Sequence, residues 1–344
     1  MREAVVDALE KFGTSCTSSR VLTGTRQLHR DLELRLAAFL GKEDSLAFTT
    51  GYLANIGALP ALVGRHDAVF FDAEVHACII DGMRLSGADA IRFGHSDVAE
   101  LERLLAESTA ARKLIVIDSI YSMNGDVAPL EAMVDLADHY GAWMFVDDAH
   151  GTGVIGPGGR GLAHACGVED RVPIIMGVFS KSLASTGGFV AGSKDLIEHL
   201  TVNARAFLFS NALAPAQAAA ALASLRILEA EPERAAFALT RANEARERLR
   251  AIGWRCGGDG THMVPVMIGD PNRTLMITAA LEQHGVVVSP AVHPAVPRGK
   301  DLLRQNFSPT LTDEQFERAL GAFEAVFDLM PEAADERESE LTAA

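Results

Sequence analysis

Two short apolar stretches decide the fold of this sequence: Trp143-Met-Phe-Val-Asp-Asp-Ala-His150 and Ile174-Ile-Met-Gly-Val-Phe-Ser-Lys-Ser182. Short apolar runs that end abruptly in polar residues are consistent with buried strands. About thirty residues separate the two runs, which leaves room for a crossover between parallel strands. We therefore expect two strands of one parallel sheet, with Asp147 at the exit of the first and Lys181 near the exit of the second.

The pattern around these runs extends the sheet. Strand-like runs alternate with amphipathic helical segments through the middle of the chain, which predicts an α/β fold with a mostly parallel central sheet. The expected strands span residues 68–71, 90–93, 114–118, 143–147, 174–178 and 189–191. Helices are expected over 97–107 and 130–140, and Ser96-Asp97 is the cap signal of the first.

A second, smaller α+β domain is expected towards the end of the chain. An alanine-rich helix begins near Pro215, and a charged helix over 233–252 starts just after Pro232, where proline favours a helix opening. The elements expected after it are strands over 263–268, 286–289 and 302–307 and a closing helix over 313–330. The sequence thus predicts an N-terminal segment (1–24), a large domain (25–225), a small domain (226–331) and a frayed acidic tail (332–344).

The bulk composition excludes several classes of protein. The 344 residues are 48% hydrophobic and 22% charged, which is an ordinary soluble balance, and a net charge of −15 argues against a nucleic-acid binder. No apolar run is long enough to span a membrane, and the first residues do not read as a signal peptide. The four cysteines have no CxxC spacing, so we expect neither a metal site nor disulfides, and a cytoplasmic protein.

The pairing of Asp147 with Lys181 predicts a pyridoxal phosphate enzyme. A buried carboxylate keeps the ring nitrogen of that cofactor protonated, and a lysine bonds its aldehyde and later serves as a general base. His150 lies three residues after Asp147, within reach of the same ligand. Ordinary alternatives exist for each residue: a solvated loop or helix cap, a loop histidine and a surface lysine. The flanking Ser180 and Ser182 favour a buried role for Lys181.

The cofactor's phosphate requires backbone N–H donors, which the N-terminus of a helix provides together with a favourable dipole. Thr49-Thr-Gly-Tyr-Leu-Ala-Asn55 contains a turn of small residues that opens a helix, so Gly51 and Tyr52 are the candidate donors. A glycine turn before a helix is also common as plain structure.

With these residues assembled, the chain resembles the α-oxoamine synthase family of fold type I pyridoxal phosphate enzymes. The resemblance runs from about Phe12 to Phe327. Its most specific pieces are Gly13-Thr-Ser-Cys-Thr-Ser-Ser-Arg20, Ser122-Met-Asn-Gly-Asp126, Val146-Asp-Asp-Ala-His-Gly-Thr-Gly153, Gly159-Arg-Gly161 and Phe179-Ser-Lys-Ser182. It implies a large domain around the cofactor, a smaller C-terminal domain, and a homodimer that shares its active sites.

The resemblance also implies roles for individual residues. The catalytic candidates are the ring-stacking His76, the pyridinium partner Asp147, the phenolic-oxygen contact His150 and the covalently bonded Lys181. Further cofactor contacts are expected from Ser122 and Ser180, and from Ser210-Asn211 of the neighbouring subunit. Arg304 matches the arginine that grips the carboxylate of the amino acid, for which a bidentate guanidinium is well suited.

The sequence departs from the family pattern in several places. Val178 stands where a threonine usually binds the phosphate, and Asn211 stands where a hydroxyl residue is common. Asp118 stands where many members have glutamate. The usual N-terminal segment of the family is absent. We expect one of three explanations: the start site is misassigned, the chain is trimmed, or this member has a smaller acyl channel.

The leading functional hypothesis is an acyltransferase that joins an α-amino acid to an acyl thioester, with loss of carbon dioxide, to give an α-aminoketone. The surroundings of Lys181 and the stretch Ser289-Pro-Ala-Val-His-Pro-Ala-Val-Pro297 are closer to the serine palmitoyltransferase branch than to the biotin branch. Two alternatives stay open: a non-catalytic scaffold subunit of the same fold, and another fold type I activity such as an aldolase or aminotransferase. The sequence leaves open whether coenzyme A or a carrier protein holds the thioester.

Overall fold

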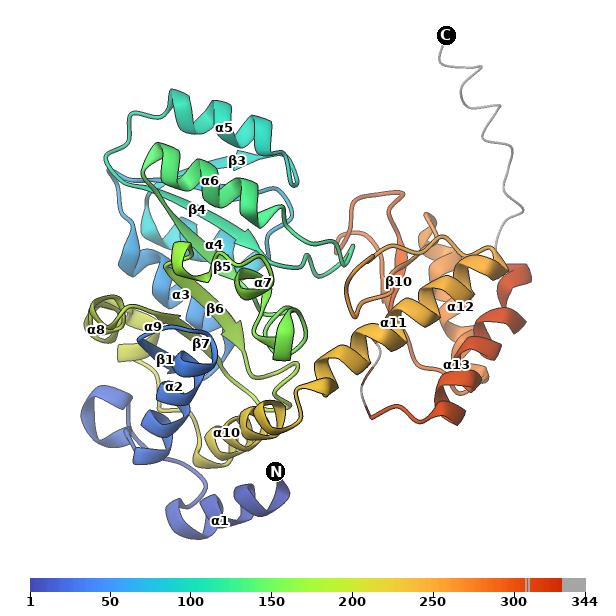
Figure 1. Cartoon of the computed structure of the whole chain (residues 1–344), viewed down its shortest axis with the longest axis horizontal. Helices are drawn as coiled ribbons and strands as arrows, with labels where there is room; N and C mark the ends of the chain where they lie inside the picture. The colour runs from blue at the N-terminus through green and yellow to red at the C-terminus, as the bar shows by residue number, and fades with distance from the viewer. Residues whose placement is uncertain (307, 309, 330–344) are drawn as a thin grey trace. The chain divides into compact units, whose positions relative to one another are not determined.

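A computed structural model describes residues 1–306, 308 and 310–329 of the chain, which divide into two compact units (Figure 1). The first unit contains residues 1–122 and 127–236, and the second contains residues 123–126 and the described residues from 237 onward. The boundary falls inside helix α11 (Glu233–Ile252). The predicted domain limits at 24, 225 and 331 stay predictions, and the predicted acidic tail lies outside the described residues.

A seven-stranded sheet forms the centre of the first unit, in the order β1-β7-β6-β5-β4-β2-β3. The strands are β1 (Asp44–Phe48), β2 (Ala68–Asp72), β3 (Asp89–Phe93), β4 (Lys113–Asp118), β5 (Ala142–Asp147), β6 (Ile174–Val178) and β7 (Gly188–Gly192). All run parallel except β7, which is antiparallel to both of its neighbours. The predicted strands of this sheet are confirmed to within one residue at each end.

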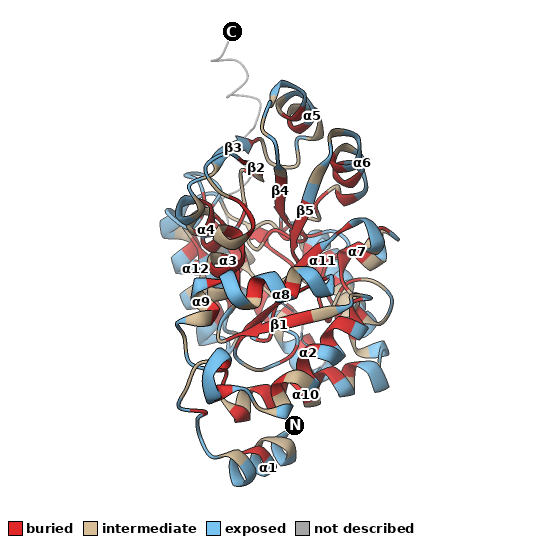
Figure 2. Cartoon of the chain, turned by 90° about the vertical axis from the view of Figure 1, so that its left-hand side faces the viewer, coloured by how far each residue is buried: buried red, intermediate tan, exposed pale blue. Residues whose placement is uncertain are grey.

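Helices alternate with these strands along the chain and pack beside the sheet (Figure 1). They are α1 (Arg2–Phe12), α2 (Gln27–Phe39), α3 (Gly51–Leu62), α4 (Ala77–Ser86), α5 (Val98–Glu107), α6 (Leu130–Tyr140), α7 (Leu162–Ala165), α8 (Lys194–Asn203), α9 (Arg205–Leu208) and α10 (Pro215–Ala230). Short helical turns lie at Arg20–Gly24, Pro157–Gly159 and Glu169–Arg171. Apart from the edge strand β3, the strands are largely buried, while helices such as α5, α6 and α8 keep an exposed face (Figure 2), so the apolar core lies against the sheet.

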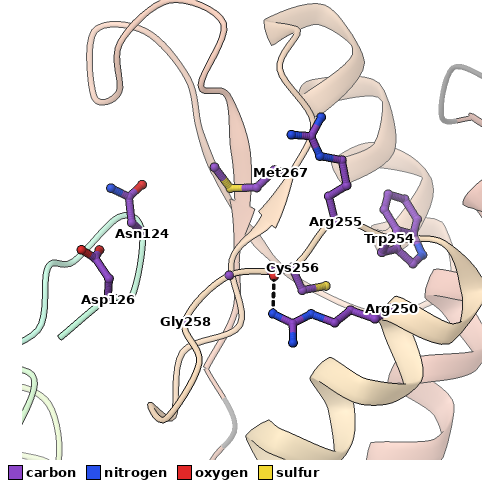
Figure 3. Close-up of a pocket in the computed structure, with 9 residues that line it drawn as sticks. Asn124, Asp126, Arg250, Trp254, Arg255, Cys256, Gly258 and Met267 are labelled. Atoms are coloured by element: carbon purple, nitrogen blue, oxygen red, sulfur yellow. Dashed lines mark hydrogen bonds between the residues drawn. The ribbon is translucent and has the colours of Figure 1, made fainter. Parts of the chain in front are cut away.

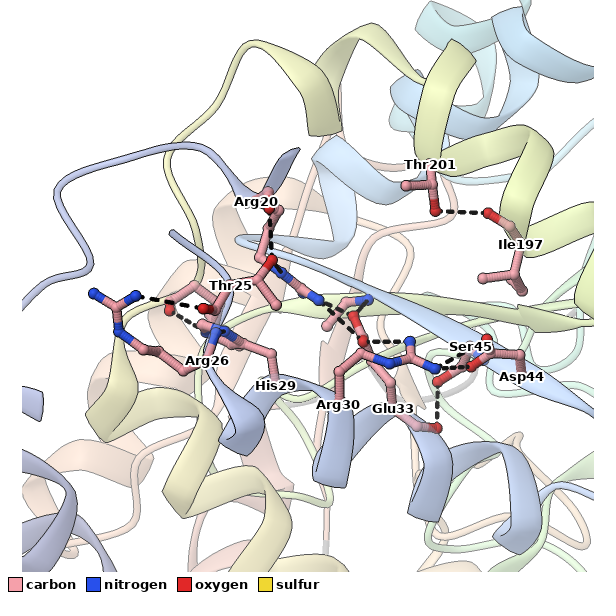
Figure 4. A network of polar contacts seen from close by, with 12 residues as sticks. Arg20, Thr25, Arg26, His29, Arg30, Glu33, Asp44, Ser45, Ile197 and Thr201 are labelled. Atoms are coloured by element: carbon pink, nitrogen blue, oxygen red, sulfur yellow. Dashed lines mark hydrogen bonds and ion pairs between the residues drawn. The ribbon is translucent and has the colours of Figure 1, made fainter. Parts of the chain in front are cut away.

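Strand β1 was missed because its first half is polar. A buried network satisfies these polar groups instead of water (Figure 4). Glu33 is fully buried and accepts hydrogen bonds from Arg20 (2.7 and 3.0 Å) and Arg30 (2.7 Å), while Arg30 also binds Asp44. The hydroxyl of Ser45 donates to the carbonyl of Glu33 at 2.7 Å. Because each buried charge has partners, β1 can begin with Asp-Ser and still enter the sheet.

The second unit contains a three-stranded antiparallel sheet in the order β8-β10-β9. Its elements are β8 (Val266–Met267), α12 (Pro271–Gln283), β9 (Ser289–Ala291), β10 (Leu302–Arg304), α13 (Asp313–Ala325) and a 3-10 turn (Phe327–Leu329). The core packs around Trp254, whose ring lies edge-on to Phe323 and Phe327.

Several predictions for this unit were wrong in extent. The strand expected over 263–268 is reduced to β8, with isolated bridges at Met263 and Cys256. The strand expected over 286–289 begins only at Ser289, because Val287 is 85% exposed and has no sheet to pack on. The last expected strand ends at Arg304, and the closing helix ends at Ala325. Residues 307 and 330, the far ends of those two predictions, lie outside the described residues.

Candidate active site

The predicted site residues of the first unit follow the carboxyl ends of neighbouring parallel strands. Asp118 ends β4, Asp147 ends β5, and the two are direct register partners across the sheet. Lys181 follows β6, the next strand along, and His76 follows β2. Polar side chains at this edge of a parallel sheet are well placed to meet a common ligand.

Asp147 is buried, and its carboxylate is held by two uncharged donors. Its Oδ2 accepts a hydrogen bond from the amide Nδ2 of Asn55 at 2.7 Å, and its Oδ1 accepts one from the backbone N–H of Ala149 at 3.1 Å. Asn55 is fully buried on α3. The sequence alone does not predict this positioning role, although Asn55 closes the stretch that contains Gly51 and Tyr52. The fixed carboxylate suits a cationic N–H group of a ligand.

Asp118 shows that these groups lie close together. Burial, and then the neighbouring charge of Asp147, raise the pKa of Asp118 well above its ordinary value, while the charge of Lys181 opposes the rise. One oxygen of Asp118 also lies 3.5 Å from the backbone N–H of His76. The structure therefore brings Asp118, Asp147, His76 and Lys181 into one neighbourhood.

The expectation that Lys181 is buried was wrong for this single chain, in which the lysine is exposed. Strand β6 ends at Val178, and the following turn carries the lysine beyond the end of the sheet. The turn is closed by backbone hydrogen bonds from Phe179 to Gly187 (2.9 Å) and from Ser185 to Phe179 (2.8 Å). Ser180 and Ser182 are exposed on the same turn, and the hydroxyl of Ser182 donates to the carbonyl of Thr152 at 2.6 Å.

His76 caps the N-terminus of α4. Its Nδ1 accepts a hydrogen bond from the backbone N–H of Cys78 at 3.2 Å and lies 2.8 Å from the thiol sulfur. Burial, followed by the charge of Asp147, raises the pKa of Cys78 to about 12, so the thiol stays protonated. An Nδ1 that accepts carries no proton, which places the proton of neutral His76 on Nε2. The cap orients the exposed ring by its inner nitrogen and leaves Nε2 for a ligand.

The residue after Asp147 has a structural task. Asp148 is buried and accepts hydrogen bonds from the hydroxyl of Thr152 (2.7 Å) and the backbone N–H of Leu162 (3.4 Å). Gly161, with φ of 90°, leaves no room for a side chain, because a Cβ there would lie 2.1 Å from Oδ2 of Asp148. Asp148 thus organises the turn that carries His150, which is itself buried.

Asp148 predicts a pH dependence of stability. Burial raises its pKa to about 6 from an ordinary 3.8. The folded state therefore binds more protons between these values, and its stability falls as the pH rises from about 4 to about 6, by about 3 kcal/mol. Asp148→Asn removes this titration. The difference in stability between this variant and the parent, measured as the free energy of unfolding in urea, should therefore shift in favour of the variant from pH 4 to pH 7.5. An equal difference at both pH values contradicts the assignment.

The start of α3 provides the predicted phosphate cradle. Thr50 caps the helix by accepting from the N–H of Leu53 at 3.1 Å, while Gly51 and Tyr52 occupy the first turn, whose N–H groups have no carbonyl of the helix to bind. Val178 packs directly against this turn: a Cβ on Gly51 would lie 2.3 Å from its Cγ1. The side chain of Tyr52 bonds instead to Asp81.

The remaining candidates lie elsewhere. Ser122 follows β4, is half-buried, and is the last residue before the 123–126 segment of the second unit. Asn211 is exposed and pairs with Ser19 in an isolated bridge, while Ser210 precedes it after α9. Nothing in the described contacts of one chain joins Ser210-Asn211 to the α3 cradle.

Arg304 belongs to the second unit, at the end of β10. Burial lowers its pKa, and its Nε is buried without a hydrogen-bond partner among the described residues. It lines a cavity of about 500 Å³ together with Gln305, Gln315 and Arg318. An unpaired guanidinium N–H beside a cavity suits an anionic group such as a carboxylate.

A second cavity of this unit, of about 540 Å³, lies between the 123–126 segment and the end of α11 (Figure 3). Its lining includes Asn124, Asp126, Arg255 and Met267, and Arg250 donates to the carbonyl of Cys256 at 2.7 Å. None of the predicted site residues lines it, so it carries no part of the predicted chemistry.

Comparisons with known proteins agree with this geometry. The sequence matches the family described as aminotransferase class I and II over residues 2–323. It is 44% identical to a serine palmitoyltransferase of Sphingobacterium spiritivorum, with 94% of this chain and 82% of the relative covered. It is 42% identical to an 8-amino-7-oxononanoate synthase of Anaeromyxobacter dehalogenans strain 2CP-1, with 98% and 85% covered. The chain belongs to the α-oxoamine synthase family.

Solved structures of α-oxoamine synthases have the same fold. Serine palmitoyltransferase of Sphingomonas wittichii aligns with a TM-score of 0.93 at 36% identity, over 96% of this chain and 84% of that protein. A serine palmitoyltransferase solved with pyridoxal phosphate aligns equally well, over 95% and 83%. The predicted family and the predicted fold class, a fold type I transferase with a mostly parallel sheet, are confirmed. Among the described residues, no helix has the length and apolar character needed to cross a membrane.

Proposed function

We propose that this α-oxoamine synthase uses pyridoxal phosphate to condense an α-amino acid with an acyl thioester, releasing carbon dioxide and an α-aminoketone. The observation that carries the proposal is the neighbourhood of Asp147, Asp118, His76 and Lys181 at the end of the sheet, next to the open first turn of α3. The names of the relatives suggest serine and a palmitoyl thioester as the first substrates to test.

The residues present fit the cofactor. The α3 cradle offers N–H groups at Gly51 and Tyr52 for a phosphate, and Gly51 has no side chain to obstruct it. The fixed carboxylate of Asp147 would hold a proton on the ring nitrogen, and His150 would donate to the phenolic oxygen. The orphan Nε of Arg304 would bind the substrate's carboxylate.

When bound, pyridoxal phosphate supplies an electron sink for the pair left behind when the Cα–H bond breaks. The chain's own residues handle the proton and the orientation. The Nζ of Lys181 takes the proton from Cα, as its exposed position beside Asp118 allows. His76, oriented through Nδ1, presents its ring and its Nε2 to the ligand. Ser122 and Ser180 are proposed as further contacts to the cofactor.

The test uses purified protein with pyridoxal phosphate. Serine, alanine and glycine are each supplied with and without palmitoyl-coenzyme A, and carbon dioxide, free thiol and aminoketone are measured. The proposal requires all three products in equal amounts and only when both substrates are present. Turnover of an amino acid without thioester favours an aldolase or aminotransferase instead, and cofactor binding without any turnover favours a scaffold subunit.

We also propose a homodimer that shares its active sites. Asn211 is exposed and pairs with Ser19, and the N–H of the next residue, Ala212, donates to the carbonyl of Ser18. Two large apolar side chains close to this contact in the sequence are also exposed, Phe209 (75%) and Leu22 (76%). Apolar side chains of this size are typical of the buried centre of a permanent interface. Sedimentation should give a dimer, and a fully active monomer at low concentration contradicts the proposal.

The four unpaired cysteines are compatible with a reducing cytoplasm, which we propose as the location.

Val178 gives a prediction for cofactor affinity. The valine packs on Gly51, so Val178→Thr would place a hydroxyl beside the phosphate cradle with little change of volume. A hydrogen bond to a charged group contributes about 1.5–3 kcal/mol, so the dissociation constant of pyridoxal phosphate should fall roughly tenfold or more. Val116→Thr, which adds a hydroxyl in the middle of β4, is the control and should not tighten binding. Unchanged affinity in Val178→Thr means that other donors already satisfy the phosphate.

A further inference from the structure

A buried carboxylate that the chemistry above does not use lies at the end of β2. Asp72 is fully buried and accepts hydrogen bonds from three directions. Its Oδ1 accepts from the backbone N–H of Glu74 (2.8 Å) and lies 3.0 Å from Nδ1 of His95, and its Oδ2 accepts from the N–H of Ser96 (2.7 Å). These donors come from the loops after β2 and β3, so one side chain ties two neighbouring loops together.

His95 extends this cluster to a third loop. Its Nε2 lies 3.9 Å from the carboxylate of Glu74, so the imidazole bridges Asp72 and Glu74. Its ring also packs edge-on against the buried ring of Tyr121, with centroids 4.4 Å apart and planes at 90°. Tyr121 follows β4 and immediately precedes Ser122.

The backbone of this cluster is strained at one point. Ser96 has φ of 54°, a left-handed conformation that is costly for a residue other than glycine. Such a conformation persists where its surroundings fix it, and here the N–H of Ser96 is held by Asp72. Burial pushes the pKa of Asp72 upward, but the hydrogen bonds from His95 and from the two N–H groups outweigh it, so the carboxyl is ionised at neutral pH.

The geometry points to Asp72 and His95 as positioning residues for His76 and Ser122. The hydrogen bond from Glu74 fixes the chain halfway between Asp72 and His76. The ring of His95 packs on Tyr121, which is directly bonded to Ser122 in the chain. This inference rests on the proposed function, because there His76 and Ser122 contact the cofactor. The contacts of Asp72 and His95 described above are with loop residues and with Tyr121, so both act through the loops that they hold.

The test compares loss of this cluster with loss of a matched ion pair at the other end of the same strand. Asp67, just before β2, is also buried, accepts from a backbone N–H at 2.8 Å and binds Arg112 at 2.7 Å. Asp67→Asn is therefore a control for general destabilisation. His95→Leu removes the bridge, and His95→Gln keeps an N–H donor that can reach Asp72.

Hydrogen–deuterium exchange of the cofactor-free protein is the first readout. In His95→Leu, the amides of residues 73–76 should exchange faster, while Asp67→Asn leaves them unchanged and His95→Gln restores part of the protection. Unchanged exchange in His95→Leu overturns the inference. This readout does not require turnover, so it separates failure of this inference from failure of the proposed function.

The second readout is turnover. His95→Leu should lower kcat roughly 10-fold to 100-fold, the range expected when a reacting group is misplaced. The same substitution in a His76→Ala background should then have much less effect, because its target is already lost. If the two effects multiply independently, His95 does not act through His76 and this part of the inference is wrong.

Discussion

Lys181→Ala is expected to abolish turnover while leaving the fold intact. The side chain lies on the exposed turn after β6, outside the apolar core, so its removal costs little packing. It removes the amine proposed both to bond the cofactor's aldehyde and to take the Cα proton. Loss of the general base alone costs about 10²–10⁴-fold in rate, and loss of the covalent link adds to this.

Three measurements check this expectation: turnover, the visible absorbance of bound cofactor that borohydride reduction removes, and the melting temperature. The first two should disappear and the third should stay near that of the parent protein. Lys194→Ala is the matched control, since Lys194 is an exposed lysine on α8 whose ammonium group lies 3.9 Å from the carboxylate of Glu198. Cofactor that borohydride reduction still attaches covalently to Lys181→Ala assigns the covalent link to another amine.

Asp147→Asn is expected to keep the cofactor bound but to slow proton removal from Cα. The amide can still accept from Asn55 through its oxygen, so the local hydrogen bonds survive in part, but it carries no charge to hold a proton on the ring nitrogen. Losing one preorganised electrostatic partner costs about 10²–10³-fold in rate, or about 3–4 kcal/mol.

Exchange of the amino acid's Cα hydrogen with deuterated water, followed by NMR without thioester, isolates the affected step. Asp148→Asn is the neighbouring control: its carboxylate is equally buried but faces Thr152 and Leu162 rather than the ligand. Exchange should be slow only in Asp147→Asn. Near-normal exchange in that variant removes Asp147 from the proposed role, and equal loss in both variants points to general disruption of the loop.

The sequence predicted local elements well wherever their residues carry the signal themselves. Helix α11 begins and ends where its proline and charge pattern predict, and β6 is a continuous apolar run. Asp97 accepts from the N–H of Glu100 at 2.8 Å, as its cap signal predicts. Strand β1 was missed because the groups that stabilise its polar start, Arg30 and Glu33, come from a different element.

The candidate site also combines features that are local in the sequence with contacts that form only in the folded chain. The positions of Asp147 and Lys181 after two buried runs are local features, so the sequence by itself determined the family, the cofactor chemistry and the two strands that carry it. Only the tertiary structure decided that Asn55 holds Asp147, that Val178 packs on Gly51, and that Asp72 joins the loops after β2 and β3. The physical reason is that hydrogen bonds and steric contacts act over a few ångströms in space, and residues brought that close by a parallel sheet are separated in sequence by whole crossover connections.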